Sequence, residues 1–250
     1  MKISVITVTF NSASTIARTL QSVAQQSYPD VEQIVVDGGS TDGTCELVRA
    51  LGIPGTRLVS EPDKGIYDAM NKGLALATGD VVGFLNSDDS YAAADVLAKV
   101  AQWIQSQGGQ DAVFGDVAFF DPGQPNRMLR HYRSRRFRPA RLAWGWMPAH
   151  PAMFILRSVY GQVGNFRTDY RIAGDYEWIA RAFRTRCMRY RHLPEVLVHM
   201  QMGGVSTGGW RNTLLLNQEV LRACRDNGID TNWLKILSKY PAKLLEFIQP

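Results

Sequence analysis

The chain has 250 residues and a mass of 27.9 kDa, enough for one large α/β domain or two small ones with a buried core. Hydrophobic residues make up 45%, charged residues 20%, and the mean hydropathy is −0.17, which argues against a disordered, collagen-like or coiled-coil chain. The net charge is +5 and the pI is about 9.2, a mild excess that favours anionic partners.

The sequence also gives expectations about location. No apolar stretch approaches the roughly 18 residues that a membrane span needs, so we expect no integral membrane protein. The apolar residues 3–10 are interrupted by three polar side chains, which indicates a buried first strand and not a signal peptide. The three cysteines lie far apart and outside any CxxC pattern, which argues against disulfides or a zinc site and favours the reducing cytoplasm.

The first half of the chain alternates apolar runs with helical patterns. Residues 3–10 are rich in β-branched side chains and end at Asn11, and the spacing of Ile16, Leu20 and Val23 predicts a helix after them. The same alternation continues at residues 33–36 (strand), 45–48 (helix), 58–59 (strand), 66–77 (helix) and 81–85 (strand). Strands and helices that alternate with short connections predict βαβ units and a mostly parallel sheet.

After residue 110 the pattern is less regular. We expect one or two strands over residues 111–120, a basic stretch over 127–141, an aromatic loop at 144–150, a helix over 176–185 and a strand over 195–200. A glycine-rich loop at 203–209 precedes two helices, over residues 212–226 and 232–248. We therefore expect one domain over residues 1–210 and a C-terminal helical extension over residues 211–250.

Polar residues follow the expected strands directly. Ligands of open parallel sheets bind beyond the carboxyl ends of the strands, so residues 9–11, 37 and 86–89 should face one crevice if these strands are neighbours. The sharpest feature is the pair Asp88 and Asp89 after a wholly apolar strand. Adjacent carboxylates suit a divalent cation such as Mg²⁺ or Mn²⁺. An Asp-rich turn that caps the next helix explains the pair equally well.

A second acidic turn, Asp37-Gly38-Gly39-Ser40, also has two interpretations. The glycines are typical of a strand-to-helix turn that needs positive φ angles. Alternatively, the carboxylate accepts hydrogen bonds from a base or a ribose. The chain has neither a GxGxxG nor a GxxxxGK[ST] pattern, so hydride-transfer and P-loop chemistry lose their usual support.

Several motifs occur together in a fixed order. They are SVITVTFN from residue 4, VDGGSTDGT from 36, SEPDKGIYDAMNKG from 60, TGD from 78 and NSDD from 86. This combination resembles the family-2 glycosyltransferases of the GT-A fold, among them bacterial enzymes of O-antigen, exopolysaccharide and colanic-acid biosynthesis. The resemblance covers roughly residues 1–210. It implies an α/β fold with a mostly parallel central sheet flanked by helices, followed here by a C-terminal helical tail.

The resemblance implies a nucleotide-sugar donor, with UDP as the default, inversion at the anomeric carbon, and Mn²⁺ or Mg²⁺ as cofactor. Donor contacts are implied for Thr9, Asn11, Asp37, Gly38, Asp63, Lys64, Asp68, Asn71, Asn86 and Asp88. Metal ligation is implied for Asp88 and Asp89. Asn86 stands where many relatives begin this motif with Asp, which leaves the motif one carboxylate fewer. Residues 203–206 resemble the segment that covers the donor diphosphate.

An inverting displacement needs a carboxylate that accepts the proton of the acceptor hydroxyl. The segment AGDYEW from residue 173 matches the family segment that usually supplies it, with Asp175 as the expected base and Glu177 in reserve. Without the resemblance, an N-cap at Asp175 and an acidic first helical turn would be the simpler interpretation. His150 matches an acceptor-side loop, and His199 is a further candidate for the acceptor or the diphosphate, although isolated histidines are often structural.

The distribution of basic residues gives an expectation about the acceptor. Seven arginines lie between residues 127 and 141. A nucleic-acid patch would need a recognisable binding module, which is not visible, and a solvated basic face is the plain alternative. The resemblance favours an anionic lipid surface or a polyprenyl-diphosphate-linked saccharide acceptor. Apolar residues and lysines mixed over residues 232–248 suit a helix at the inner-leaflet headgroups, or one that packs on the domain or another subunit. We therefore expect a protein that is peripheral on the inner face of the cytoplasmic membrane.

The leading hypothesis is an inverting glycosyltransferase that acts on a lipid-linked saccharide in bacterial surface polysaccharide synthesis. One alternative is a sugar-phosphate nucleotidyltransferase, which would need a glycine-rich basic segment after the first strand, where this chain has TFNS. The other is a non-catalytic nucleotide- or polyanion-binding module, which predicts binding without turnover.

Overall fold

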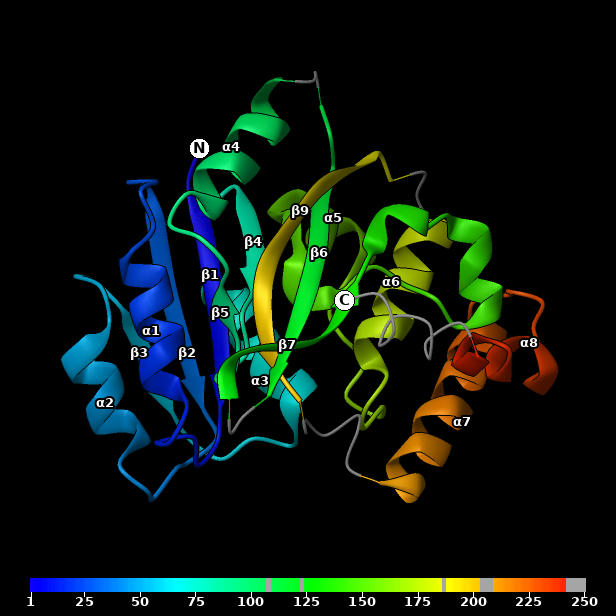
Figure 1. Cartoon of the computed structure of the whole chain (residues 1–250), viewed down its shortest axis with the longest axis horizontal. Helices are drawn as coiled ribbons and strands as arrows, with labels where there is room; N and C mark the ends of the chain where they lie inside the picture. Colours follow the sequence, from blue (N-terminus) through cyan, green and yellow to red (C-terminus); the bar gives the residue numbers. More distant parts are fainter. Residues whose placement is uncertain (107–108, 122–123, 186–187, 203–208, 242–250) are drawn as a thin grey trace.

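The computed structural model describes residues 1–106, 109–121, 124–185, 188–202 and 209–241. Within these ranges a single nine-stranded sheet runs through the molecule in the order β3-β2-β1-β4-β8-β6-β9-β5, and β7 pairs with β6 off this path (Figure 1). Helices cover both faces of the sheet, so the expected α/β class is confirmed.

The bounds of the elements are as follows. The strands are β1 (Ile3–Thr9), β2 (Val31–Asp37), β3 (Arg57–Ser60), β4 (Val81–Phe84), β5 (Ser90–Tyr91), β6 (Ala112–Asp121), β7 (Gln124–Tyr132), β8 (Met153–Leu156) and β9 (Tyr190–Gln201). The α-helices are α1 (Ile16–Ala24), α2 (Thr44–Leu51), α3 (Ile66–Leu76), α4 (Val96–Ser106), α5 (Arg157–Val163), α6 (Gly174–Thr185), α7 (Trp210–Asp226) and α8 (Trp233–Leu237). Short 3-10 helices are η1 (Ser134–Arg136), η2 (Pro139–Trp144) and η3 (His150–Ala152).

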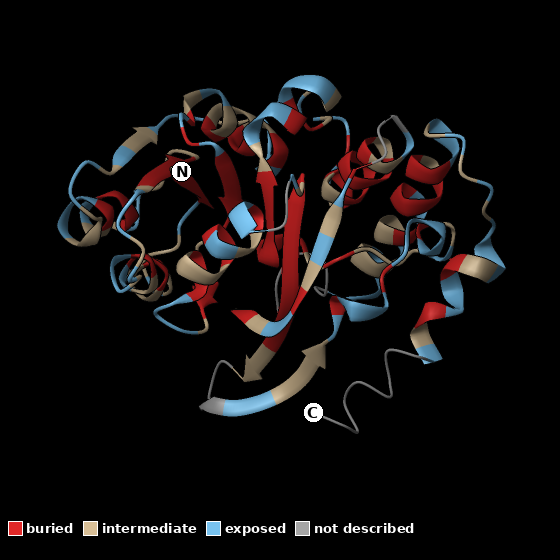
Figure 2. Ribbon diagram, turned by 90° about the horizontal axis from the view of Figure 1, so that it is seen from above, coloured by how far each residue is buried: buried red, intermediate tan, exposed pale blue. Residues whose placement is uncertain are grey.

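The amino-terminal strands form the parallel part of the sheet. β1 lies between β2 and β4 and is parallel to both, and β3 pairs in parallel with β2. Every residue of β1 is buried, as expected for a strand covered on both faces. Ile6 and Val8 pack in the core on the α3 side, whereas Val5 packs in a second core with residues of α1 and α4. Figure 2 shows the central strands buried along their length.

The second half of the sheet is mixed, not parallel. β8 runs antiparallel to both β4 and β6, β9 is parallel to β6, and β5 and β7 are antiparallel edge partners. The expectation of a mostly parallel sheet therefore applies to β1–β4. The physical reason is the hairpin of β6 and β7 and the return of the chain through β8, which the sequence pattern did not predict.

The carboxyl-terminal helices pack beside α6. α7 contacts α6, and α8 contacts α7 and η2 (Figure 1). The helix expected over residues 232–248 begins at Trp233 and is recorded to Leu237, while residues 242–250, like the glycine-rich residues 203–208, lie outside the described residues. Among the residues that are described, no helix combines the length and apolar character needed to cross a bilayer.

Candidate active site

The carboxyl ends of β1, β2 and β4 meet at one edge of the sheet, as predicted for neighbouring strands. Thr9, the last residue of β1, pairs in register with Asp37, the last residue of β2. The turn that begins at Asn86 follows β4 on the other side of β1. The Thr9 hydroxyl is buried and has no hydrogen-bond partner among the described residues. This edge therefore combines acidic turns with an unsatisfied polar atom.

Asp37 is fully buried and its carboxylate is occupied by the protein itself. Oδ2 accepts hydrogen bonds from the backbone amides of Gly39 (3.1 Å) and Ser40 (2.9 Å) and from the hydroxyl of Ser60 (2.6 Å). Burial raises its pKa, but hydrogen bonds from Ser40, Ser60 and Cys45 outweigh it and lower the pKa of Asp37 below the usual value. These contacts favour the turn-forming interpretation of Asp37 over direct ligand binding.

Gly38 and Asn11 join the loops around this edge. A Cβ atom at Gly38 would lie 2.6 Å from Oδ2 of Asp63, so a larger residue at this position would displace the Asp63 carboxylate. Oδ1 of Asp63 accepts a hydrogen bond from the Gly65 amide at 2.8 Å. The Asn11 side chain accepts from the Thr41 amide at 3.0 Å, and Asn11 has a positive φ of 47°. These contacts join three loops at the edge of the sheet where we expect the donor to bind.

A cavity of about 170 Å³ opens beside the start of α3. Residues 64–68 line one side and residues 168–171 line the other. The exposed Lys64 contributes its backbone amide to Oδ2 of Asp68 (3.0 Å), and Asp68 also lies 3.7 Å from the Lys72 ammonium group. Lys64 and Asp68 therefore line a cavity, and their contact with the donor stays a prediction.

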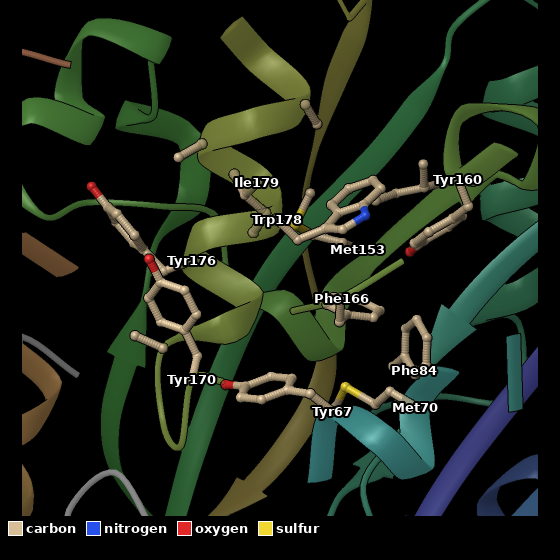
Figure 3. Close-up of a cluster of buried hydrophobic side chains, with 14 of the residues drawn as sticks. Tyr67, Met70, Phe84, Met153, Tyr160, Phe166, Tyr170, Tyr176, Trp178 and Ile179 are labelled. Atoms are coloured by element: carbon tan, nitrogen blue, oxygen red, sulfur yellow. The ribbon is translucent and has the colours of Figure 1, made fainter. Parts of the chain in front are cut away.

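Asn71 binds the backbone of a distant part of the chain. Its Nδ2 donates to the Phe166 carbonyl at 2.8 Å, and its Oδ1 accepts from the Phe166 amide at 2.9 Å. Both ends of the amide hold the backbone of a residue 95 positions away, so these contacts favour a structural role in which Asn71 fixes Phe166 in the core. A donor contact of Asn71 stays a prediction. In Figure 3, Phe166 lies among Tyr67, Phe84, Tyr160 and Trp178.

The Asn86–Asp89 turn contains unsatisfied oxygens. Asp89 is fully buried, and its Oδ2 accepts from the Asn86 amide nitrogen at 3.2 Å, whereas its Oδ1 and the Oδ1 of Asn86 have no partner among the described residues. Burial and the neighbouring charge of Asp88 raise the pKa of Asp89 well above its ordinary value. The partly exposed Asp88 forms no recorded hydrogen bond or ion pair through its carboxylate within the described residues.

These atoms suit a hard divalent cation. Carboxylate and amide oxygens are the ligands that Mg²⁺ and Mn²⁺ prefer, and Mg²⁺ sites commonly use one or two carboxylates, with phosphate and water oxygens completing the shell. The described residues hold no cluster of three or more His, Cys, Asp or Glu side chains able to bind a metal alone. A cation at this turn would therefore depend on the donor phosphates for part of its coordination.

Arg18 on α1 was not predicted as a site residue. Its guanidinium Nη2 donates to the Asp88 carbonyl at 2.6 Å, and its buried Nε has no partner among the described residues. Its charge opposes the rise in the pKa of Asp89 that burial causes, and it adds to the effect of burial in lowering the pKa of His199. An arginine here is suited to bind a phosphate. A single basic residue within an amphipathic helix carries no sequence signal for this role.

Asp175 lies in the first turn of α6 beside a tyrosine of α3. Its Oδ1 accepts from the Tyr176 amide (2.8 Å) and lies 3.2 Å from the Tyr67 hydroxyl, which also donates to the Ile172 carbonyl (2.6 Å). Burial raises the pKa of Asp175, although the His150 charge and these hydrogen bonds oppose the rise. A carboxylate with a raised pKa that keeps one oxygen without a recorded partner is suited to accept a proton. Tyr67 was not predicted, although it lies within the motif from residue 60.

His150 lies between the strand that leads to Asn86 and the start of α6. Its ring stacks on Phe84 of β4 with a centroid distance of 5.4 Å and meets Phe166 edge-on at 5.8 Å. Burial lowers the pKa of His150, while the nearby charge of Asp175 raises it. His150 and Asp175 therefore lie close enough to interact electrostatically, and a role of His150 on the acceptor side stays a prediction.

Glu177 and His199 have different surroundings. The Glu177 carboxylate is buried and paired with Arg181, with Oε1 at 3.0 Å from Nε and Oε2 at 3.1 Å from Nη2. Because both carboxylate oxygens of Glu177, the reserve candidate for the base, are paired with Arg181, these contacts favour a structural role for Glu177. His199 on β9 packs on Phe120 at 4.5 Å, and burial followed by the charge of Arg18 lowers its pKa. His199 therefore remains a candidate on the diphosphate side.

Comparisons with known proteins agree with this architecture. The sequence model described as "Glycosyl transferase family 2" matches residues 4–164. A "PGL/p-HBAD biosynthesis glycosyltransferase" from Mycobacterium bovis is 35% identical over 208 residues, covering 81% of this chain and 78% of the relative. An uncharacterized glycosyltransferase from Mycobacterium tuberculosis is 33% identical over 195 residues, covering 72% of this chain and 68% of the relative.

Solved structures share the fold at low sequence identity. S. aureus TarS 1–349 in complex with UDP-GlcNAc has a TM-score of 0.69 at 19% identity, covering 89% of this chain and 66% of that chain. The mannosyltransferase PcManGT from Pyrobaculum calidifontis, in complex with GDP-Man and Mn²⁺, has a TM-score of 0.63 at 24% identity, covering 88% and 64%. This chain thus spans about two thirds of these solved chains, and 40% of the chain in a further crystal structure of S. aureus TarS. The fold is that of the GT-A glycosyltransferases, and the chain belongs to glycosyltransferase family 2.

Proposed function

We propose that the protein transfers a sugar, with inversion, from a nucleotide-diphosphate sugar to a hydroxyl group of a lipid-linked saccharide in bacterial surface polysaccharide synthesis. The observation that carries the proposal is the placement of Asp175, with its raised pKa, beside His150 and Tyr67, at the side of the sheet edge that holds the Asn86–Asp89 turn. UDP is the preferred nucleotide, which the TarS complex with UDP-GlcNAc supports, and GDP is the alternative that PcManGT supports.

In the proposed reaction the acceptor oxygen attacks the anomeric carbon as the bond from that carbon to the phosphate oxygen breaks. The electron pair of the broken bond leaves with the nucleoside diphosphate, and the acceptor proton passes to Asp175. Tyr67 holds the Asp175 carboxylate in place through the 3.2 Å hydrogen bond. Asn86, Asp88 and Asp89 would hold the divalent ion, which neutralises charge on the leaving diphosphate. Arg18 adds a fixed positive charge at the same turn.

We further propose that the protein works at the inner surface of the cytoplasmic membrane, bound through the region where η2 meets α8. The Thr231 hydroxyl joins the two elements by donating to the Ala143 carbonyl at 2.6 Å. Residues three apart share one face of a 3-10 helix, which aligns basic and aromatic side chains on η2. The exposed residues of this surface are Arg138, Arg141, Trp144, Trp233, Leu234 and Leu237. Exposed aromatic and aliphatic groups beside arginines suit an anionic lipid surface.

Titration calorimetry with UDP, GDP and dTDP, each with and without Mn²⁺, tests the donor class. We expect metal-dependent binding of one nucleotide, and binding of none of them by folded protein would contradict the proposal.

The variant Asp175→Asn tests the base, since it should retain this nucleotide binding and lose sugar transfer. Glu177→Gln is the matched control, since it removes a carboxylate two residues away. It should lose stability, because it breaks the ion pair with Arg181, but it should still transfer sugar. Transfer by Asp175→Asn at the wild-type rate would rule out this residue as the base.

A further inference from the structure

Glu219 on α7 holds the backbone segment that leads into α6. Its carboxylate is 7% exposed and accepts three hydrogen bonds, Oε1 from the Arg171 amide (2.7 Å) and Oε2 from the amides of Ile172 and Ala173 (both 2.8 Å). No ion pair is recorded for it within the described residues. A buried carboxylate is therefore stabilised by backbone donors alone, which fixes these donors in turn.

Residues 171–173, the segment that Glu219 binds, contact the surroundings of the proposed base Asp175. The Ile172 carbonyl accepts from the Tyr67 hydroxyl at 2.6 Å, and the Ala173 carbonyl accepts from the Glu177 amide at 2.9 Å, which closes the first turn of α6 around Asp175. Tyr67 has one hydroxyl proton and two acceptors, the Ile172 carbonyl and, at 3.2 Å, Asp175. The position of the Ile172 carbonyl therefore determines how much of that proton is available to Asp175.

We propose that Glu219 is a positioning residue for the glycosyl transfer, acting on Asp175 through the backbone of residues 171–173 and through Tyr67. The inference rests on the proposed function, since it takes Asp175 as the base. It also makes α7 a working part of the active site, although this helix follows the residues that resemble the family.

The variant Glu219→Gln isolates this effect. Its amide nitrogen would replace one carboxylate oxygen and face a backbone N–H instead of accepting from it, so the segment must move. Movement of Ile172 leaves the Tyr67 proton to Asp175 and opens the base to solvent, and both changes favour the charged carboxylate. The acid limb of the pH–rate profile should therefore shift to lower pH.

Other contacts should keep α7 in place in this variant. Asp226 of α7 accepts from Arg167 (2.8 Å) and from the Tyr170 hydroxyl (3.0 Å), and Arg222 pairs with Asp169. These bonds anchor the helix to residues 167–170 independently of Glu219. We therefore expect a folded protein whose segment 171–173 is altered locally.

The experiment compares Glu219→Gln with Glu32→Gln by steady-state release of nucleoside diphosphate from the accepted nucleotide sugar, over a range of pH. Glu32 is the matched control because it is also a buried glutamate held by hydrogen bonds, from Ser4 and Thr78, at the opposite end of the sheet. For Glu219→Gln we expect kcat to fall about 10- to 100-fold, KM for the donor to stay within about threefold, and the acid limb to move down. Glu32→Gln should lower the melting temperature and leave kcat, the KM for the donor and the acid limb of the pH–rate profile unchanged.

A kcat within about twofold of wild type, or a loss of kcat with an unmoved acid limb, would overturn the inference. Should Glu219→Gln fail to fold, Glu219→Asp replaces it, since its shorter carboxylate cannot reach all three amides. Asp175→Asn, assayed in parallel, separates the two proposals. If Asp175→Asn is fully active, the proposed function fails, whereas an inactive Asp175→Asn with a normal Glu219→Gln contradicts only the role of Glu219.

Discussion

Gly174, the first residue of α6, packs closely against the ring of Tyr67. A Cβ atom there would lie 2.7, 2.8 and 2.9 Å from Cε2, Cδ2 and Cζ of Tyr67. Ordinary contact begins at 3.4 Å, so in Gly174→Ala the tyrosine ring or the helix must move by about 0.7 Å. Tyr67 is buried and stacked on Phe166, which leaves its ring little room to move. We therefore expect the displacement to disturb the 3.2 Å contact between the Tyr67 hydroxyl and Asp175.

Both stability and rate should change by calculable amounts. Overpacking of this kind costs about 1–3 kcal/mol. For a chain of this length each kcal/mol lowers the melting temperature by about 2–4 °C, so we expect a fall of about 2–12 °C. A misplacement approaching 1 Å at a group that positions the base should lower kcat by about 100-fold.

Gly161→Ala is the matched control, because it introduces the same methyl group into another helix. A Cβ at Gly161 in α5 would meet no atom within 4 Å. Replacing an exposed helical glycine stabilises by about 0.5–1 kcal/mol, so this variant should melt slightly higher and keep full activity. Differential scanning fluorimetry and nucleotide release, measured on both variants, give the comparison. The reasoning is refuted if Gly174→Ala melts like Gly161→Ala and turns over like wild type.

Three further outcomes are expected. The first concerns Glu32. Burial raises the pKa of this residue, yet hydrogen bonds from Ser4 and Thr78 outweigh burial and lower the pKa from 4.5 to about 2. This corresponds to at most about 3 kcal/mol of stability, present above pH 4.5 and lost as pH falls towards 2. Urea unfolding of wild type and Glu32→Gln should thus differ at pH 7 and converge near pH 2. Arg18→Ala should weaken nucleotide binding about tenfold by calorimetry, whereas the exposed Arg49→Ala should not. Leu234→Glu should reduce co-flotation with phosphatidylglycerol vesicles, and equal flotation of both proteins would contradict the proposed surface.

The first four strands could be predicted because their pattern is local. β1, β2 and β4 are short apolar runs that stop at polar turns, and parallel strands covered on both faces require such runs. Their order in space did not follow from this pattern alone, because β4 lies beside β1 and not beside β3, the strand that precedes it in the chain. The convergence of Thr9, Asp37 and the Asn86 turn was therefore predicted only on the condition that these strands are neighbours.

The second half of the sheet and several contacts near the site could not be predicted, because they join distant parts of the chain. β8 has four residues and pairs with β4 and β6, strands that begin 72 and 41 positions before it. The amide of Asn71 binds Phe166, and the carboxylate of Glu219 binds residues 171–173. A polar residue within a helical pattern predicts only a solvated position, because its partner is not encoded nearby. For this reason the structural contact of Asn71 was not predicted, and Arg18 and Glu219 were overlooked.

Asp37 and Asp89 show why the sequence alone could not rank the acidic turns. Both are fully buried aspartates close to the carboxyl end of a parallel strand, and both had a structural and a functional interpretation. Asp37 accepts hydrogen bonds from Gly39, Ser40, Ser60 and Cys45, and its pKa is lowered. Asp89 has a single side-chain donor in Asn86 and an unsatisfied Oδ1, and its pKa is raised. The protein already satisfies the charge of Asp37, whereas a bound cation would stabilise the charge of Asp89. The number of hydrogen-bond donors around each carboxylate therefore directs the metal proposal to Asp89 and its neighbours.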